Sequence, residues 1–90
     1  MAVLRIPTQL RNLSANEAEV KVEGATVAEV LRGLNEQHPG FGERLFDDHG
    51  GLRRFVNVFV ADEDIRFLQN LDTPVDDATV VSIVPAVAGG

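Results

Sequence analysis

One segment of this chain, residues 26–37, has the apolar spacing of an α-helix, whereas the segments before and after it alternate as β-strands do. Thr26 and Glu29 form a capping box, in which the Thr26 hydroxyl accepts from the Glu29 N–H and the Glu29 carboxylate reaches back to the Thr26 N–H. The apolar stripe that follows consists of Val27, Val30, Leu31 and Leu34. Gly33 weakens this helix by about 1 kcal/mol relative to alanine. The pair His38-Pro39 ends it, because the residue before proline disfavours the helical region.

Two short strands are predicted before the helix. Residues 3–7 alternate, with Leu4 and Ile6 on one face, and Pro7 ends the run. A polar stretch covers residues 8–16. Residues 17–23 then alternate again, which predicts a half-buried edge strand whose inward residues are Ala18, Val20 and Val22.

The second half of the chain predicts three more strands. A short turn over residues 41–46 and a loop over 47–51 precede a strand over residues 53–61. Residues 62–64 read as a turn and residues 65–67 as a brief strand, followed by an irregular connection over residues 69–78. The last strand covers residues 79–85, and its inward residues are Val81 and Ile83.

This order predicts an α+β fold with a mixed sheet of four to five strands and one main helix packed on one face. A single helix covers one face of such a sheet, so the other face is open to solvent or to a partner. Its apolar residues form a larger patch than a small acidic monomer needs. We expect a partner docking surface there, formed by Phe55, Asn57, Phe59, Val80 and Val84.

Composition narrows the possible functions. Ninety residues make one domain. The net charge of -6 disfavours nucleic acid and anionic lipid and favours a partner with a basic surface. The sequence carries no signal of self-association, and at this size we expect a monomer when free. No apolar run is long enough to span a bilayer, and a cytoplasmic location is expected. The absence of cysteine excludes disulfides, thiolate ligands and cysteine nucleophiles on the chain itself.

The C-terminus places two glycines directly after an apolar strand. Gly89 and Gly90 lack Cβ atoms, so the tail can pass through a narrow channel and present its terminal carboxylate to another protein. We therefore expect a domain over residues 1–85 and a flexible tail over residues 86–90, in which Val87, Ala88 and Gly89 thread into a partner's active site. The structural alternative is an ordinary frayed end.

Together, the strand order, the capped helix and the terminal Gly-Gly resemble the β-grasp fold of ubiquitin and of the prokaryotic sulfur carriers. The resemblance spans the chain and is strongest to the bacterial sulfur carrier of cysteine biosynthesis, in residues 54–57, 62–67 and 84–90. The molybdopterin synthase small subunit is similar in the tail, and the thiamine sulfur carrier is related.

This resemblance implies that Gly90 is the sulfur-carrying residue. An ATP-dependent activating enzyme would adenylate the Gly90 carboxylate and convert it to a thiocarboxylate. A biosynthetic enzyme, such as a pyridoxal-phosphate-dependent cysteine synthase or a thiosugar synthase, would then accept the sulfur. The carrier would be a co-substrate and not an enzyme, with no catalytic side chain, no metal and no bound cofactor, and ATP would be used by the activating enzyme.

Other interpretations remain open from the sequence. A ubiquitin-like modifier would be joined through Gly90 to lysines of target proteins, and it would share the activation step. A plain β-grasp interaction module would carry its Gly-Gly end by chance. His38 and His49 are best explained as surface histidines, and Asp62-Glu63-Asp64 as a solvated turn rather than a cation site.

Overall fold

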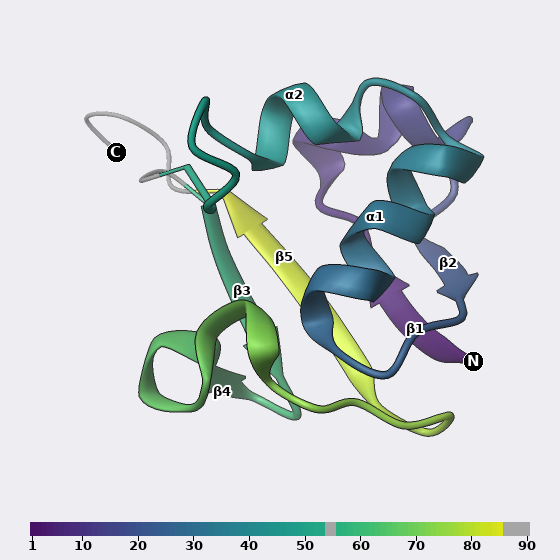
Figure 1. Ribbon diagram of the computed structural model, residues 1–90. Coiled ribbons are helices and arrows are strands. Elements are labelled where there is room, and N and C mark those ends of the chain that lie inside the picture. The colour runs from purple at the N-terminus through teal and green to yellow at the C-terminus, as the bar shows by residue number, and fades with distance from the viewer. Residues whose placement is uncertain (54–55, 86–90) are drawn as a thin grey trace.

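A computed structural model describes residues 1–53 and 56–85. In this part of the chain a five-stranded mixed sheet packs with one face against two α-helices, α1 (Val27–Gln37) and α2 (Phe41–Leu45) (Figure 1). The strand order is β2-β1-β5-β3-β4. The strands are β1 (Ala2–Arg5), β2 (Glu19–Val22), β3 (Val56–Val60), β4 (Glu63–Asp64) and β5 (Val80–Pro85).

The pairing of the strands makes β5 central. It runs parallel to β1 on one side and antiparallel to β3 on the other, while β2 and β4 pair antiparallel at the two edges. The predicted α+β class and mixed sheet are therefore confirmed. Three 3₁₀ helices complete the described elements: η1 (Thr8–Ser14), η2 (Ile65–Phe67) and η3 (Asn70–Asp72).

The start of α1 differs from the predicted capping box in one bond. The Thr26 hydroxyl accepts from the Glu29 N–H at 3.3 Å, as predicted. The Glu29 carboxylate, however, accepts from the N–H of Ala25 at 3.3 Å and not from that of Thr26. Both hydrogen bonds of the capping motif are therefore present, but the Glu29 carboxylate bonds the backbone one residue earlier than predicted.

The hairpin between β3 and β4 corrects three predictions. Its loop consists of Ala61 and Asp62, with φ values of 50° and 72°, which is the left-handed geometry of a two-residue turn. This turn is earlier than predicted, so Glu63 and Asp64 form strand β4 rather than a turn. The segment Ile65–Phe67 is the 3₁₀ helix η2 and not a strand, because the Asp64 side chain accepts the Arg66 N–H at 2.9 Å and caps a helical turn.

The first half of the chain requires smaller corrections. The polar stretch after β1 contains the helix η1, and residues 41–46 include the second α-helix instead of a turn alone. Ala18, predicted to point inward, is exposed, because β2 begins at Glu19 and Ala18 contributes its carbonyl to the Ile6 N–H at 2.8 Å.

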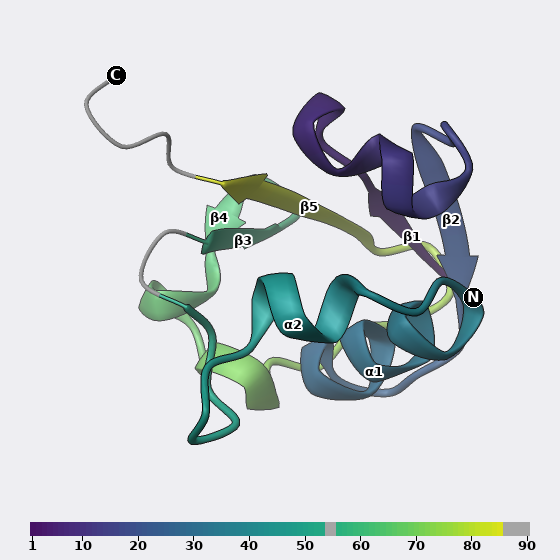
Figure 2. The same ribbon diagram turned by 90° about the horizontal axis from the view of Figure 1, so that it is seen from above.

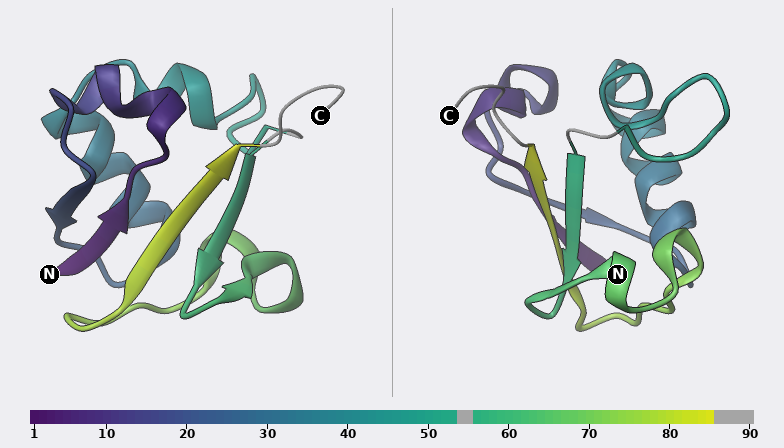
Figure 3. Two further views of the ribbon diagram at one scale, coloured as in Figure 1. Left: turned by 180° about the vertical axis from the view of Figure 1, so that it is seen from behind. Right: turned by 90° about the vertical axis from the view of Figure 1, so that its left-hand side faces the viewer.

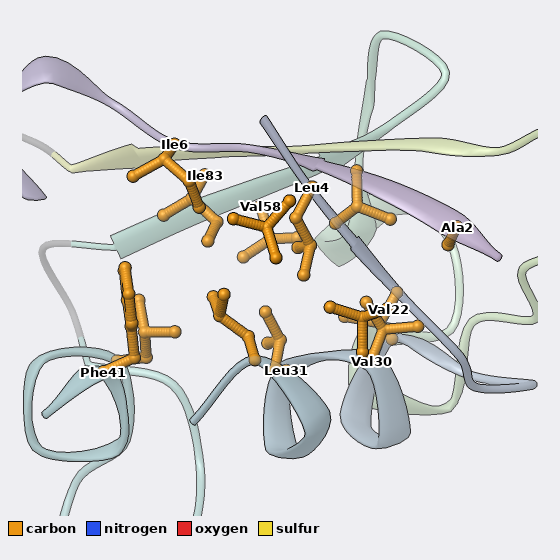
Figure 4. Close-up of a cluster of buried hydrophobic side chains, with 14 of the residues drawn as sticks. Ala2, Leu4, Ile6, Val22, Val30, Leu31, Phe41, Val58 and Ile83 are labelled. Atoms are coloured by element: carbon orange, nitrogen blue, oxygen red, sulfur yellow. The ribbon is translucent and has the colours of Figure 1, made fainter. Parts of the chain in front are cut away.

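The core lies between one face of the sheet and the two α-helices. Figure 4 shows Leu4, Val58 and Ile83 pointing from the sheet toward Leu31 and Phe41. The whole predicted stripe of α1 is fully buried. Every buried side-chain nitrogen or oxygen in the described residues has a hydrogen-bond partner, so no polar side-chain atom among them is buried without one.

Candidate functional site

The face of the sheet opposite α1 and α2 is the candidate site, and we call it the outer face. Figures 2 and 3 show the two α-helices on one side of the sheet and η1 on the other, beyond the end of β1. The outer face is defined by alternation with the buried positions of each strand. Its residues are Val3, Arg5, Glu19, Lys21, Asn57, Phe59, Asp64, Val80, Ser82 and Val84.

Four of the predicted docking residues come together on this face. Asn57 is paired directly with Val84, Phe59 with Ser82, and Val80 with Val3 of β1. Val80 and Val84 leave 38% and 44% of their surface exposed, whereas Phe59 is half-buried. The fifth predicted residue, Phe55, lies outside the described residues. The position of the four is as predicted, and their role in docking stays a prediction.

The tail residues Val87, Ala88, Gly89 and Gly90 also lie beyond the described part of the chain. What the structure does describe is the strand that carries them. β5 pairs with β1 over residues 80–82 and with β3 over residues 81–85, and it ends at Pro85, which is paired with Val56 at the start of β3. The tail therefore begins from the central strand, at the end of the sheet where η1 lies (Figure 3).

Arg66 also belongs to this site, although no pattern in the sequence indicated it. Because η2 turns the chain back after β4, the Arg66 guanidinium donates to the Asn57 side-chain oxygen. Its Nε also lies 3.9 Å from a carboxylate oxygen of Asp64. A strand over residues 65–67 would have directed the chain along the sheet edge. The signal that could have revealed the turn is Asp64, two residues before the backbone N–H that it caps.

Two aspartates have lowered pKa values, and both lie in turns outside the strands of the sheet. Backbone N–H bonds from His49 and Gly51 to Asp47 lower the pKa of that carboxyl. The hydroxyl of Thr79, followed by the N–H of Ala78, lowers the pKa of Asp76. Both shifts reflect local turn geometry rather than a catalytic environment.

The histidines do not form a site. His38 is half-buried and its ring meets the Phe41 ring edge-on, with centroids 6.4 Å apart, and His49 is exposed on the loop after α2. Within residues 1–53 and 56–85, no three His, Asp or Glu side chains come together as a metal site would require. None of the helices in the same ranges has the length and apolarity needed to cross a bilayer.

Comparison with known proteins identifies relatives along the whole chain. Residues 4–90 match the model of the ThiS family. The sulfur carrier protein CysO of Mycobacterium tuberculosis is 44% identical over 87 residues, which cover 94% of each chain. Small archaeal modifier protein 3 of Haloferax volcanii is 38% identical over 68 residues, covering 76% of this chain and 73% of that protein.

The fold shows the same relationship. The structure matches a chain of the Amycolatopsis orientalis BexX/CysO complex with a TM-score of 0.93 and 41% identity, over 100% of both chains. The β-grasp fold implied by the sequence is thereby confirmed. A family match over nearly the full length, a relative at 44% identity and the shared fold lead to one conclusion. The chain belongs to the ThiS family of sulfur carrier proteins.

Proposed function

We propose that this carrier holds sulfur as a thiocarboxylate on the C-terminal carboxyl of Gly90. The observation that carries the proposal is that the tail follows in sequence on β5, which pairs with β1 over residues 80–82 and with β3 over residues 81–85. Residues 86–90 can extend at most about 18 Å beyond that strand, since an extended residue spans roughly 3.3–3.6 Å. A fixed base with a short reach suits delivery of one terminal group into a partner's active site.

The chemistry requires little from the carrier. A carboxylate is a poor acyl donor, so the activating enzyme would first join it to AMP, with pyrophosphate released from ATP. A sulfur nucleophile would then displace AMP, which leaves sulfur in place of one carboxylate oxygen. The protein supplies the carboxyl group and the docking surface, and as a sulfur carrier it is a co-substrate rather than a catalyst. A chain without cysteine has no thiol of its own to capture the activated end.

The relatives support a class of enzyme that would accept the sulfur. A similar CysO is found in a complex with BexX, which supports a second partner beyond the activating enzyme. By resemblance, a pyridoxal-phosphate-dependent cysteine synthase or a thiosugar synthase in the cytoplasm would take the sulfur. The outer face provides the contact, because Val80 and Val84 are exposed apolar side chains on the strand that leads into the tail.

A second function has one observation in its favour. The relative from Haloferax volcanii is named a modifier protein, and conjugation of Gly90 to lysines of target proteins would use the same adenylated end. The two functions differ in the nucleophile that follows, sulfur in one case and an amine in the other. The molybdopterin synthase small subunit is a further alternative with the same activation step.

The test is to add one alanine after Gly90. The extension moves the carboxylate by one residue and places a Cβ where the tail ends, so the variant should acquire no thiocarboxylate in its native cell. An Asp48→Ser variant is the matched control, because Asp48 is an exposed residue of the loop after α2. Thiocarboxylation of the extended protein at the wild-type level would refute the proposal.

A further inference from the structure

A hollow of about 560 Å³ opens on the outer face at the end of the sheet where the tail begins. One wall is η1, which lies on the side of the sheet opposite α1 (Figure 2). The floor is the end of β5. The residues that give the hollow its character are Arg5, Pro7, Gln9, Arg11, Ser82 and Val84.

Two arginines make this hollow basic. Arg5 projects from β1 with 64% of its side chain exposed, and its Nε lies 3.8 Å from a carboxylate oxygen of Glu19. Arg11 is fixed from η1, since its Nε donates to the Ile6 carbonyl at 3.2 Å. Glu19 is the one carboxylate among the described lining residues, so two cations face one anion. This local excess is opposite in sign to the net charge of -6 on the whole chain.

The other end of the outer face has the opposite character. A second hollow of about 520 Å³ is lined by Asp62 and Asp76, and it shares Arg5 and Ser82 with the first. The outer face therefore changes from basic beside the tail to acidic at the far end. Such a gradient can orient a partner, since opposite charges attract and like charges repel across an interface.

We infer that the hollow between η1 and β5 receives an acidic segment of the activating enzyme, whose Asp or Glu carboxylates pair with Arg5 and Arg11. The inference rests on the proposed function, because the tail must be activated for either sulfur transfer or conjugation. It refines the expectation from net charge alone, which favoured a basic partner surface. Arginine suits the role, because its planar guanidinium binds a carboxylate with two parallel hydrogen bonds.

The location supports this occupant. Val84 lines the hollow and is the last residue of β5 before Pro85, so a segment bound there would lie beside the entrance to the channel that takes the tail. Docking of that segment would fix the register of the tail at its base. The apolar surface of Val84 and the two guanidinium groups together favour a segment that combines carboxylates with apolar side chains.

The test compares two double variants of the full chain. The first carries Arg5→Gln and Arg11→Gln, and the control carries Arg32→Gln and Arg44→Gln. Arg32 and Arg44 are exposed on α1 and α2, so the control removes the same charge from the opposite side of the sheet. Each variant replaces the native protein in its own cell, and the initial rate of Gly90 thiocarboxylation after induction is followed by intact mass. We expect a loss of about tenfold in the first variant and less than twofold in the control.

Folding is checked separately, because Arg11 also bonds the Ile6 carbonyl. The single variant Arg5→Gln leaves that bond in place and should still lose about threefold in rate with an unchanged melting temperature. Equal rates in all variants would overturn the inference while leaving the carrier function intact. Absence of thiocarboxylate from the wild-type protein would instead overturn the proposed function, and the inference with it.

Discussion

Gly33 of α1 lies so close to Val22 of β2 that a Cβ at position 33 would come within 2.4 Å of a Val22 methyl carbon. Side chains do not tolerate such a distance without movement of one element. From helix propensity alone, Gly33 is predicted to destabilise the helix by about 1 kcal/mol relative to alanine. In the structure, the absence of a Cβ at Gly33 allows α1 to pack closely against β2.

Gly33→Ala should therefore destabilise the protein by about 1–3 kcal/mol, despite the better helix propensity of alanine. The measurement is the free energy of unfolding in urea. Val22→Ala alone should cost roughly 2 kcal/mol through lost methyl burial. Combined with Gly33→Ala it should cost less than the two changes added together, because the truncated side chain leaves room for the new methyl group. A more stable Gly33→Ala protein would contradict the close approach.

Thr26→Ala should lower the stability by about 1 kcal/mol, because it leaves the Glu29 N–H at the start of α1 without its side-chain acceptor. Thr26→Ser is the matched control, since serine keeps the hydroxyl and caps as well as threonine. Both are measured by urea unfolding at neutral pH. Equal losses in the two variants would show that the methyl group of Thr26, and not its hydroxyl, matters.

Thr79→Val should raise the pKa of Asp76 toward its ordinary value of 3.8, because the hydroxyl is the main group that lowers it. The folded protein favours ionised Asp76, so this group stabilises the fold above its unfolded pKa, and the contribution is lost as pH falls through the lower folded value. Titration of the Asp76 carboxyl carbon by NMR measures its pKa in the wild-type protein and in the variant. The pKa of Asp47, lowered by a different turn, should not move in the same spectra.

Val84→Asp should reduce thiocarboxylation of Gly90 by about tenfold, because it puts a charge into the apolar part of the docking surface beside the tail. Val84 is 44% exposed, so the fold should tolerate the change. Glu36→Gln on α1 is the control for altered charge on the opposite side of the sheet. An unchanged rate for Val84→Asp would place the docking surface elsewhere.

The sequence predicted the parts of the fold that have a strong period. The stripe of α1 repeats at helical spacing and the inward residues of β5 alternate, so Leu31, Val81 and Ile83 were placed correctly in the core. The turn at Ala61 and Asp62 escaped prediction, because alanine is not a residue expected at positive φ. That error displaced β4 and replaced η2 with a strand.

The strand residues of the candidate site were predictable from the sequence. Alternation alone put Asn57, Phe59, Val80 and Val84 on one face. The charged half of the site was not, because Arg66 reaches Asn57 only through the turn at η2, and Arg5 and Arg11 line one hollow with Ser82 and Val84 only through the pairing of β1 with β5 and the placement of η1. These contacts depend on tertiary arrangement, which no local pattern records.

The most direct test of the central claim is the intact mass of the protein purified from its native cell, with and without a thiol-alkylating reagent. The account predicts a gain of about 16 Da at Gly90, from sulfur in place of oxygen, and alkylation of a chain that contains no cysteine. Unmodified protein throughout, together with larger species joined through Gly90 to other polypeptides, would contradict the thiocarboxylate and support the modifier.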